Sequence, residues 1–440
     1  MSLRRELGTF DATMVVVGGI IGAGIFVNPA VVASRLPSGG LILAAWIVGG
    51  AIALAGALVF AELAAAIPLA GGEYVYLREA YHPLVAFLFG WASLLLIQGG
   101  GIAVVAITFA EYALRLTGRG LVGPTPLAIA AIALLAGINV LGVKPGSRVL
   151  NGLVILKIAA LGVLIAGGLL VPPGEAATAA AKAPLPRAGL LGFGAALVPI
   201  LFSYGGWQSA NVVAEETRDP RRTLPRALVA GTLIVILVYV AVNVVYLRAL
   251  GRDGLASTLT PAADAVRRLF GSGTDQFLSA AIAISAFGFL DLSFLAPTRI
   301  SYAMARDGLF FPALARVHPR FGTPALAILF QAVWSAVLVA GGNYGGLVDS
   351  VVFADWIFFG LSAAAVFVLR ARGPAPAGRF RAPFYPVLPL LFVAAAVVAV
   401  VSAIGSSPGR SAFGAALLAL GVPVYLFFAR RRRPSEGASA

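Results

Sequence analysis

Long apolar segments alternate with short polar ones along nearly the whole chain. Most are long enough to cross the hydrocarbon core of a bilayer as a helix, which takes about 20 residues. Charged residues, glycine and proline mark the segment ends. The pattern predicts an all-α membrane protein with twelve membrane-spanning helices, at residues 10–34, 40–67, 83–113, 125–141, 148–171, 190–217, 225–248, 276–304, 323–341, 347–370, 384–404 and 411–429.

The composition supports this assignment and sets the orientation. Of the 440 residues, 60% are hydrophobic and only 11% charged, against about 25% charged in a soluble protein. An even number of spans places both termini on one side, and the loops and tails there hold 21 of the 32 Lys and Arg residues. The positive-inside rule therefore predicts a multi-pass protein with cytoplasmic N- and C-termini. It also accounts for the net charge of +14 without nucleic acid as a partner.

Two of the predicted spans contain glycines that interrupt the helix. The first holds the stretch "GGIIGAGIF" at residues 18–26, and the sixth holds "FSYGGWQSAN" at residues 202–211. Opening a backbone inside a membrane leaves polar groups unpaired at a cost of several kcal/mol each. Interrupted helices at corresponding places in two halves of a chain indicate a transporter substrate site.

An interrupted helix offers backbone groups of both signs to a ligand. The N–H groups of Ala23, Gly24 and Ile25 can hold a carboxylate. Carbonyl oxygens can hold an ammonium group, from Gly19 and Ile20 in the first span and from Phe202, Ser203 and Tyr204 in the sixth. A zwitterionic α-amino acid satisfies both sets without a charged side chain. The alternative is that the glycines only allow close helix packing.

Side chains near the interruptions add further candidates. Phe202, Tyr204 and Trp207 flank the second one and either close over or line a substrate pocket, or belong to the core. Lys157 is the only Lys or Arg well inside a span, so it is a candidate for a fixed ammonium in place of a coupling cation, or for a proton carrier. The alternative is a structural lysine. Asp291 and Asp355 are intramembrane acids that carry a proton, pair with a basic residue or line a water-filled vestibule.

The usual components of an enzyme are missing from the sequence. His82 and His318 lie in separate predicted loops, and no metal-binding, nucleotide-binding or nucleophile motif is apparent. We therefore expect no catalytic residue, no metal and no cofactor. Cysteine is absent, which excludes a disulfide-linked partner subunit.

The chain resembles the amino acid–polyamine–organocation (APC) superfamily, and most closely its L-type amino-acid transporter branch. The stretches "VGGIIGAGIFVNPA", "AELAAAIPLAGGEYVYLREAYHP", "FSYGGWQSANVVAEETRDPRRTLPRAL" and "RISYAMARDGLFFPALARVHPRFGTP" carry the resemblance. It implies a LeuT-type fold in one transmembrane domain, residues 1–430. Residues 8–171 and 189–370 would form two inverted five-helix repeats, residues 383–430 two additional helices, and residues 431–440 a cytoplasmic tail.

The resemblance also implies roles for individual residues. The substrate carboxylate would bind at Gly22, Ala23 and Gly24, and the amine at carbonyls of Ile20 and of the sixth span. The implied substrate contacts are Ile20, Ile21, Gly22, Ala23, Gly24, Ile25, Phe202, Ser203, Tyr204, Gly205 and Trp207. Phe202 resembles a gating aromatic. Lys157 would occupy a sodium position and reach the Gly18 carbonyl and the Ser285 hydroxyl.

Two departures from the family pattern affect the expected function. Ala23 stands where relatives often have serine, which removes one hydroxyl donor. Asp291 stands where relatives often have an amide. We expect a sodium-independent exchanger of neutral L-amino acids, in a bacterial inner membrane and without a heavy subunit. A proton-coupled symporter, a carrier of cationic amino acids or amines and, more remotely, an amino-acid sensor or channel stay open.

Overall fold

The computed structural model describes residues 8–67, 72–117, 123–142, 147–170, 190–208, 211, 217–294, 300, 304–305, 308–373 and 380–431. Every regular element in this part of the chain is a helix, as the sequence predicts for a chain that must satisfy its backbone within a membrane. The helices are α1 (Thr9–Ile20), α2 (Gly24–Arg35), α3 (Gly39–Ala66), α4 (Glu73–Ala80), α5 (Pro83–Ala92), the π-helix η1 (Ser93–Ile97), α6 (Gln98–Thr117), α7 (Pro124–Val140), α8 (Ser147–Leu170), α10 (Leu190–Tyr204), α12 (Pro220–Ser257), α13 (Pro261–Phe270), α14 (Thr274–Ser293), the 3-10 helix η3 (Pro312–Ala315), α16 (Ala325–Gly341), α17 (Tyr344–Ala371), α18 (Val387–Ser406) and α19 (Pro408–Arg431).

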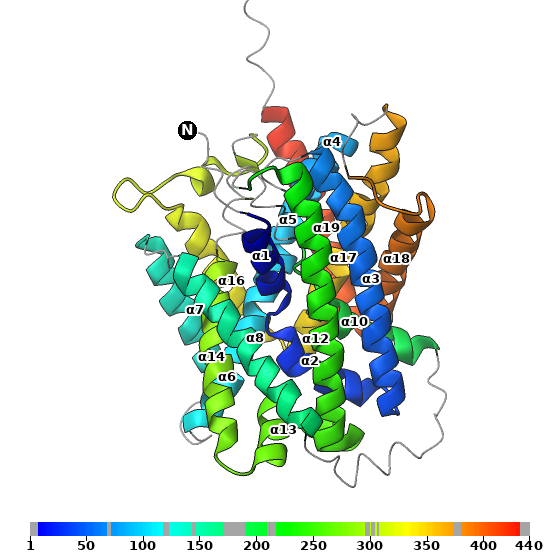
Figure 1. The fold of residues 1–440 in the computed structure, drawn as a ribbon. Coiled ribbons are helices and arrows are strands. Elements are labelled where there is room, and N and C mark those ends of the chain that lie inside the picture. Colours follow the sequence, from blue (N-terminus) through cyan, green and yellow to red (C-terminus); the bar gives the residue numbers. More distant parts are fainter. Residues whose placement is uncertain are drawn as a thin grey trace, which may run out of the picture.

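The long helices run roughly side by side in a single bundle (Figure 1). Helix α12 packs along α3, α14 packs along α6, and α18 packs on α17. The short helix α4 lies at the end of the bundle where α19 finishes, and the amphipathic helix α13 lies at the opposite end (Figure 1). The two ends of the bundle are therefore built from different short helices.

Within the part of the chain that the structure describes, seven helices are long and apolar enough to cross a membrane. The pair α1 and α2 counts as an eighth span when it is taken as one helix bent by 41°. Shorter apolar helices are Pro124–Val140, Gly192–Tyr204 and Ala325–Gly341. The chain is thus a multi-pass helical membrane protein, and the twelve-span topology stays a prediction.

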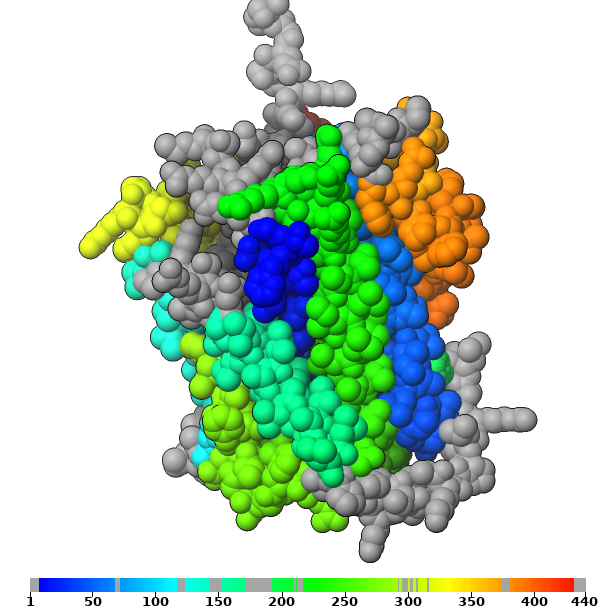
Figure 2. Space-filling view, in the orientation of Figure 1, coloured from blue at the N-terminus to red at the C-terminus, as the bar shows by residue number. Residues whose placement is uncertain are grey.

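Helix α1 lies at the surface of the bundle, against α12 and beside α8 (Figure 2). Gly231 makes the close contact with α12 possible, because a Cβ atom there would lie 2.6 Å from Cγ1 of Val16. Helix α2 continues inward, where most of its side chains are buried. The break between these two helices therefore lies at the point where the first span enters the core.

Candidate substrate site

The first predicted interruption is a real break in the helix. Helix α1 ends at Ile20 and α2 begins at Gly24, so the break comprises Ile21, Gly22 and Ala23. The N–H groups of Ala23, Gly24 and Ile25 donate to no other residue that the structure describes. They are the unpaired donors at the positive end of the α2 dipole. An anion such as a carboxylate can bind there.

Side chains from other helices bind backbone carbonyl groups on both sides of the break. The Ile20 carbonyl accepts hydrogen bonds from the Tyr239 hydroxyl at 2.9 Å and from the Gly22 N–H at 2.7 Å. Further along, the Tyr112 hydroxyl donates to the Phe26 carbonyl at 2.8 Å. The Ile20 carbonyl, an expected amine acceptor, is therefore already occupied by Tyr239, a residue that sequence reasoning missed.

Lys157 on α8 contacts the break directly. Its side chain is buried, and its Nζ donates to the Ile21 carbonyl at 2.9 Å and lies 4.7 Å from the centre of the Phe289 ring. This carbonyl partner is Ile21, whereas the sequence analysis expected Gly18. Gly18 lies within α1 and packs against Val154, whereas Ile21 lies in the open segment that faces the lysine.

The second predicted partner of Lys157 is not bonded to it either. Ser285 on α14 is buried, and its hydroxyl has no hydrogen-bond partner among the described residues. Instead, α14 presents the ring of Phe289 to the ammonium group. The contact between Lys157 and α14 is therefore a cation–π contact, which is electrostatically favourable and leaves the ammonium protons for carbonyl oxygens.

The second interruption lies directly against the first. Helix α10 ends at Tyr204, and a turn continues to Gln208 with Gly206 at a φ of 105°. A Cβ atom on Gly206 would lie 2.2 Å from the Gly19 carbonyl oxygen. One on Gly24 would lie 2.8 Å from Cα of Ser203. Only glycine allows either approach, so the two sets of glycines bring the two breaks together.

A buried asparagine joins the helices at this contact. Asn28 on α2 donates to the Pro199 carbonyl at 2.8 Å and to the Ser203 hydroxyl at 2.7 Å, both on α10. Its Oδ1 atom has no partner among the described residues. The only signal in the sequence is an asparagine next to proline within an apolar segment, and sequence reasoning passed over it.

The three aromatic residues at the second break have different surroundings. Tyr204 is buried against Trp46 and Tyr239, with ring centroids 5.7 and 5.1 Å away. Trp207 is buried against Phe60 at 4.6 Å. Only Phe202 is partly buried, so it keeps the exposure that a gate or pocket wall requires. The surroundings of Tyr204 and Trp207 favour the alternative of core aromatics.

Among the described residues, no contact joins the Asp291 side chain to either break. It is buried on α14, and its Oδ1 accepts a hydrogen bond from Asn139 Nδ2 on α7 at 2.5 Å. The same amide nitrogen donates to the Leu135 carbonyl at 2.9 Å. The acid thus has an uncharged partner, the second buried asparagine that the sequence did not single out.

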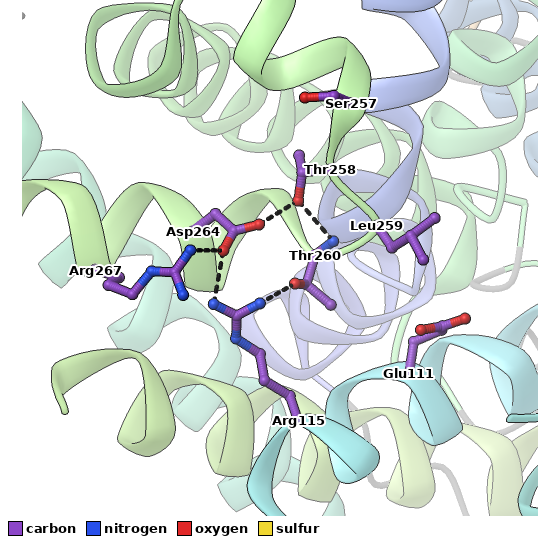
Figure 3. Close-up of a pocket in the computed structure, with 8 residues that line it drawn as sticks. All are labelled: Glu111, Arg115, Ser257, Thr258, Leu259, Thr260, Asp264 and Arg267. Carbon is purple, nitrogen blue, oxygen red and sulfur yellow. Dashed lines mark hydrogen bonds and ion pairs between the residues drawn. The ribbon is translucent and has the colours of Figure 1, made fainter. Parts of the chain in front are cut away.

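A pocket of about 300 Å³ lies beside α13, at the end of the bundle opposite α4 (Figure 1). It is lined by residues of α6, α12, α13 and the segment before α13, namely Glu111, Arg115, Ser257, Thr258, Leu259, Thr260, Asp264 and Arg267 (Figure 3). Within it, Arg115 donates to Asp264 at 2.6 Å and to the Thr260 hydroxyl at 2.8 Å. The same arginine pairs with Asp275 at 3.1 Å. These bonds fasten α13 and α14 to α6.

A membrane bundle organised around two broken helices that meet in its interior is the architecture of a secondary transporter. Comparison with known proteins gives the family. The family model for amino acid permeases matches residues 7–428. The serine/threonine exchanger SteT of Bacillus subtilis (strain 168) is 31% identical over 433 residues, which is 98% of this chain and 98% of SteT.

Human proteins are similar over nearly the same length. The large neutral amino acids transporter small subunit 2 of Homo sapiens is 32% identical over 97% of this chain and 80% of its own length. The human b(0,+)-type amino acid transporter 1 is 32% identical over 92% and 84% of the two chains. The chain belongs to the amino acid permease family of the APC superfamily. Its relatives are transporters and not enzymes, which confirms the resemblance seen in the sequence.

Proposed function

We propose that this protein is a sodium-independent exchanger of neutral L-amino acids that works by alternating access. The observation that supports the proposal is the first break, where the N–H groups of Ala23, Gly24 and Ile25 have no acceptor among the described residues and can bind an anion such as a carboxylate. The names of two relatives, a serine/threonine exchanger and a large neutral amino acids transporter subunit, support the choice of substrate and of exchange.

Lys157 is the basis for sodium independence. Its ammonium group binds the Ile21 carbonyl in the open segment of the first span. The ammonium group binds the free carbonyl in place of a metal cation, and its positive charge repels a second cation. Sodium is therefore not needed to complete the site. Substrate binding to Gly22, Ala23 and Gly24, and to carbonyls of the sixth span, is part of the same proposal.

The architecture belongs to the proposal as well. We infer two inverted repeats of five helices, at 8–171 and 189–370, followed by two additional helices. The protein would work in a bacterial inner membrane with cytoplasmic termini. It would need no heavy subunit, because the chain has no cysteine with which to attach one.

Proton-coupled symport is the second candidate. Asp291 supports it because a buried acid with an uncharged amide partner can hold a proton. The same residue would serve a carrier of cationic substrates if it faced the substrate. The described contacts of Asp291 are with Asn139, so a neutral substrate fits better.

Uptake into proteoliposomes tests the proposal. The purified protein is reconstituted in sodium-free buffer, and uptake of radiolabelled L-alanine, L-serine and L-leucine is compared with and without unlabelled amino acid inside. We expect uptake only into preloaded vesicles, with no effect of an inward proton gradient and a sharp reduction in Lys157→Ala. Uptake into vesicles without internal amino acid, driven by the proton gradient, would identify a symporter instead. Stimulation of the wild type by sodium would contradict the role given to Lys157.

A further inference from the structure

The ring of Phe289 on α14 contacts both the buried lysine and the first break. The Lys157 ammonium group lies 4.7 Å from the ring centroid. A Cβ atom on Gly22 would lie 3.5 and 3.6 Å from Cε1 and Cζ at the edge of the same ring. The ring is partly buried, whereas the lysine is fully buried. One side chain of α14 therefore joins the charge on α8 to the open segment of the first span.

Close packing of α14 on α8 brings the ring to the lysine. A Cβ atom on Gly288 would lie 2.1 Å from Cδ1 of Leu153 on α8, so the absence of a side chain there lets the two helices approach. Lys157 follows Leu153 by one helical turn and lies on the same face of α8. The position of the Phe289 ring is thus set by the packing of two helices.

Consecutive residues of the break meet different groups. The Ile21 carbonyl accepts the hydrogen bond of the Lys157 ammonium at 2.9 Å. Gly22 comes next, and its Cβ position points to the edge of the Phe289 ring. The N–H groups of Ala23 and of the first residues of α2 follow, and the proposed function assigns these donors to the substrate carboxylate. The ring edge therefore meets the break between the place of the ammonium and that of the carboxylate.

The charge distribution of an aromatic ring suits both neighbours. The faces of such a ring are electronegative and its edge is electropositive. Lys157 lies over the ring of Phe289, where a cation is attracted. The edge of the ring is turned toward Gly22, where an anion beside the break would meet positive charge.

Without this ring, the lysine would have a stronger partner than a carbonyl. An ammonium and a carboxylate a few ångströms apart attract each other strongly where water is excluded. If the Lys157 side chain left the Ile21 carbonyl for the substrate carboxylate, the substrate would bind more tightly and leave more slowly. An exchanger has to release its substrate on each side of the membrane, so such an ion pair would slow exchange.

We propose that Phe289 is a positioning residue whose ring holds the Lys157 ammonium on the Ile21 carbonyl and keeps it from the carboxylate of the bound amino acid. The carboxylate is then bound by backbone N–H groups and can be released. This separation rests on the proposed function, because it needs an amino acid at the break. The contact that holds the lysine does not.

A double-mutant cycle tests the contact in the absence of substrate. Melting temperatures of the full-length protein in detergent are compared for the wild type, Phe289→Leu, Lys157→Met and the double variant. Leucine keeps much of the bulk of the ring without its π-electrons, and methionine keeps most of the length of lysine without its charge. We expect Phe289→Leu to lower the melting temperature, and to do so much less in the Lys157→Met background. An equal loss in both backgrounds would overturn the holding role.

Phe287 provides the matched control for this cycle. It is a partly buried phenylalanine on the same helix, and it packs on Phe109 with ring centroids 5.2 Å apart. Phe287→Leu should lower the melting temperature equally with and without the Lys157 charge. If Phe287→Leu depended on Lys157 as much as Phe289→Leu does, the dependence would not come from the ring over the ammonium, and the proposal would fail.

Substrate binding and exchange test the separation. Binding of radiolabelled L-alanine and L-serine to the purified protein is measured in sodium-free buffer, and exchange is measured in proteoliposomes. Phe289→Ala should bind several-fold more tightly than the wild type and exchange several-fold more slowly, because Lys157 then reaches the carboxylate. Phe289→Leu should show the same changes to a smaller extent, and the gain in affinity should disappear in the Lys157→Met background. A merely structural loss would not raise affinity. Unchanged or weaker binding in both Phe289 variants would overturn the separation, as would a gain that persists without the lysine.

These measurements distinguish a failure of this inference from a failure of the proposed function. If the wild type neither binds nor exchanges any neutral amino acid, the proposed function fails and the separation fails with it, while the double-mutant cycle still decides the contact. If the wild type exchanges amino acids and Phe289→Ala does so with the same affinity and rate, the proposed function stands and the separation is refuted.

Discussion

At the scale of single residues, the glycines of the first break differ in what they do. Gly24 faces the backbone of Ser203, where a Cβ atom would lie 2.8 Å from Cα and 2.6 Å from Oγ. Gly22 has more room, because the nearest atom to its Cβ position is an edge carbon of Phe289 at 3.5 Å. Gly24 therefore allows α2 to pack closely on α10, whereas Gly22 has enough space beside it for a Cβ atom.

This difference predicts opposite outcomes for two alanine substitutions. Gly24→Ala should push α2 away from α10 and destabilise the protein by about 1–3 kcal/mol, as overpacking does. Gly22→Ala should change the melting temperature little. Melting temperature and exchange rate would be measured for both variants. Equal stability of the two would mean that the contact between Gly24 and Ser203 does not restrict the size of the side chain.

At the scale of helices, prolines open the backbone and other side chains fill the gaps. Pro199 in α10 cannot donate to the Ala195 carbonyl, and Arg35 at the end of α2 donates to it at 2.5 Å. Pro29 in α2 likewise leaves the Ile25 carbonyl without its helical donor, and the Tyr246 hydroxyl lies 3.5 Å from that oxygen. Each interrupted helix thus depends on a residue from another helix.

The same dependence predicts how α13 is held. Arg115 binds Asp264, Asp275 and Thr260, and its side chain is 20% exposed, so Arg115→Ala should cost about 2 kcal/mol and increase hydrogen exchange across residues 258–275. Arg267→Ala is the matched control, because Arg267 pairs with the same Asp264 from a side chain that is 55% exposed. It should cost less than about 1 kcal/mol. A loss from Arg267→Ala as large as that from Arg115→Ala would argue against Arg115 as the main attachment of α13.

At the scale of the whole molecule, charge and topology can be tested because the chain has no cysteine. Single cysteines at Ser272, between α13 and α14, and at Val317, after η3, would lie on opposite sides of the membrane if the termini are cytoplasmic. Both positions are exposed. In intact cells, a membrane-impermeant maleimide should label Ser272→Cys and not Val317→Cys, while both should react after the cells are opened. The reverse pattern would invert the proposed orientation.

Local properties of the chain determined much of this protein. Apolar length predicted the helices, because a membrane leaves the backbone no other partner than itself. Glycine in an apolar segment predicted both breaks, since glycine is a poor helix former and allows a closer approach than any residue with a side chain. The isolated intramembrane lysine required carbonyl groups or a carboxylate to compensate its charge, and the family resemblance placed its partner in the first span.

Tertiary structure decided which groups meet. Lys157 binds Ile21 and not Gly18, and Tyr239 reaches the Ile20 carbonyl from 219 positions away in the chain. The sequence does not show which partner a given carbonyl or carboxyl group will have. That partner depends on how helices distant in sequence pack, and the packing follows from all their surfaces together.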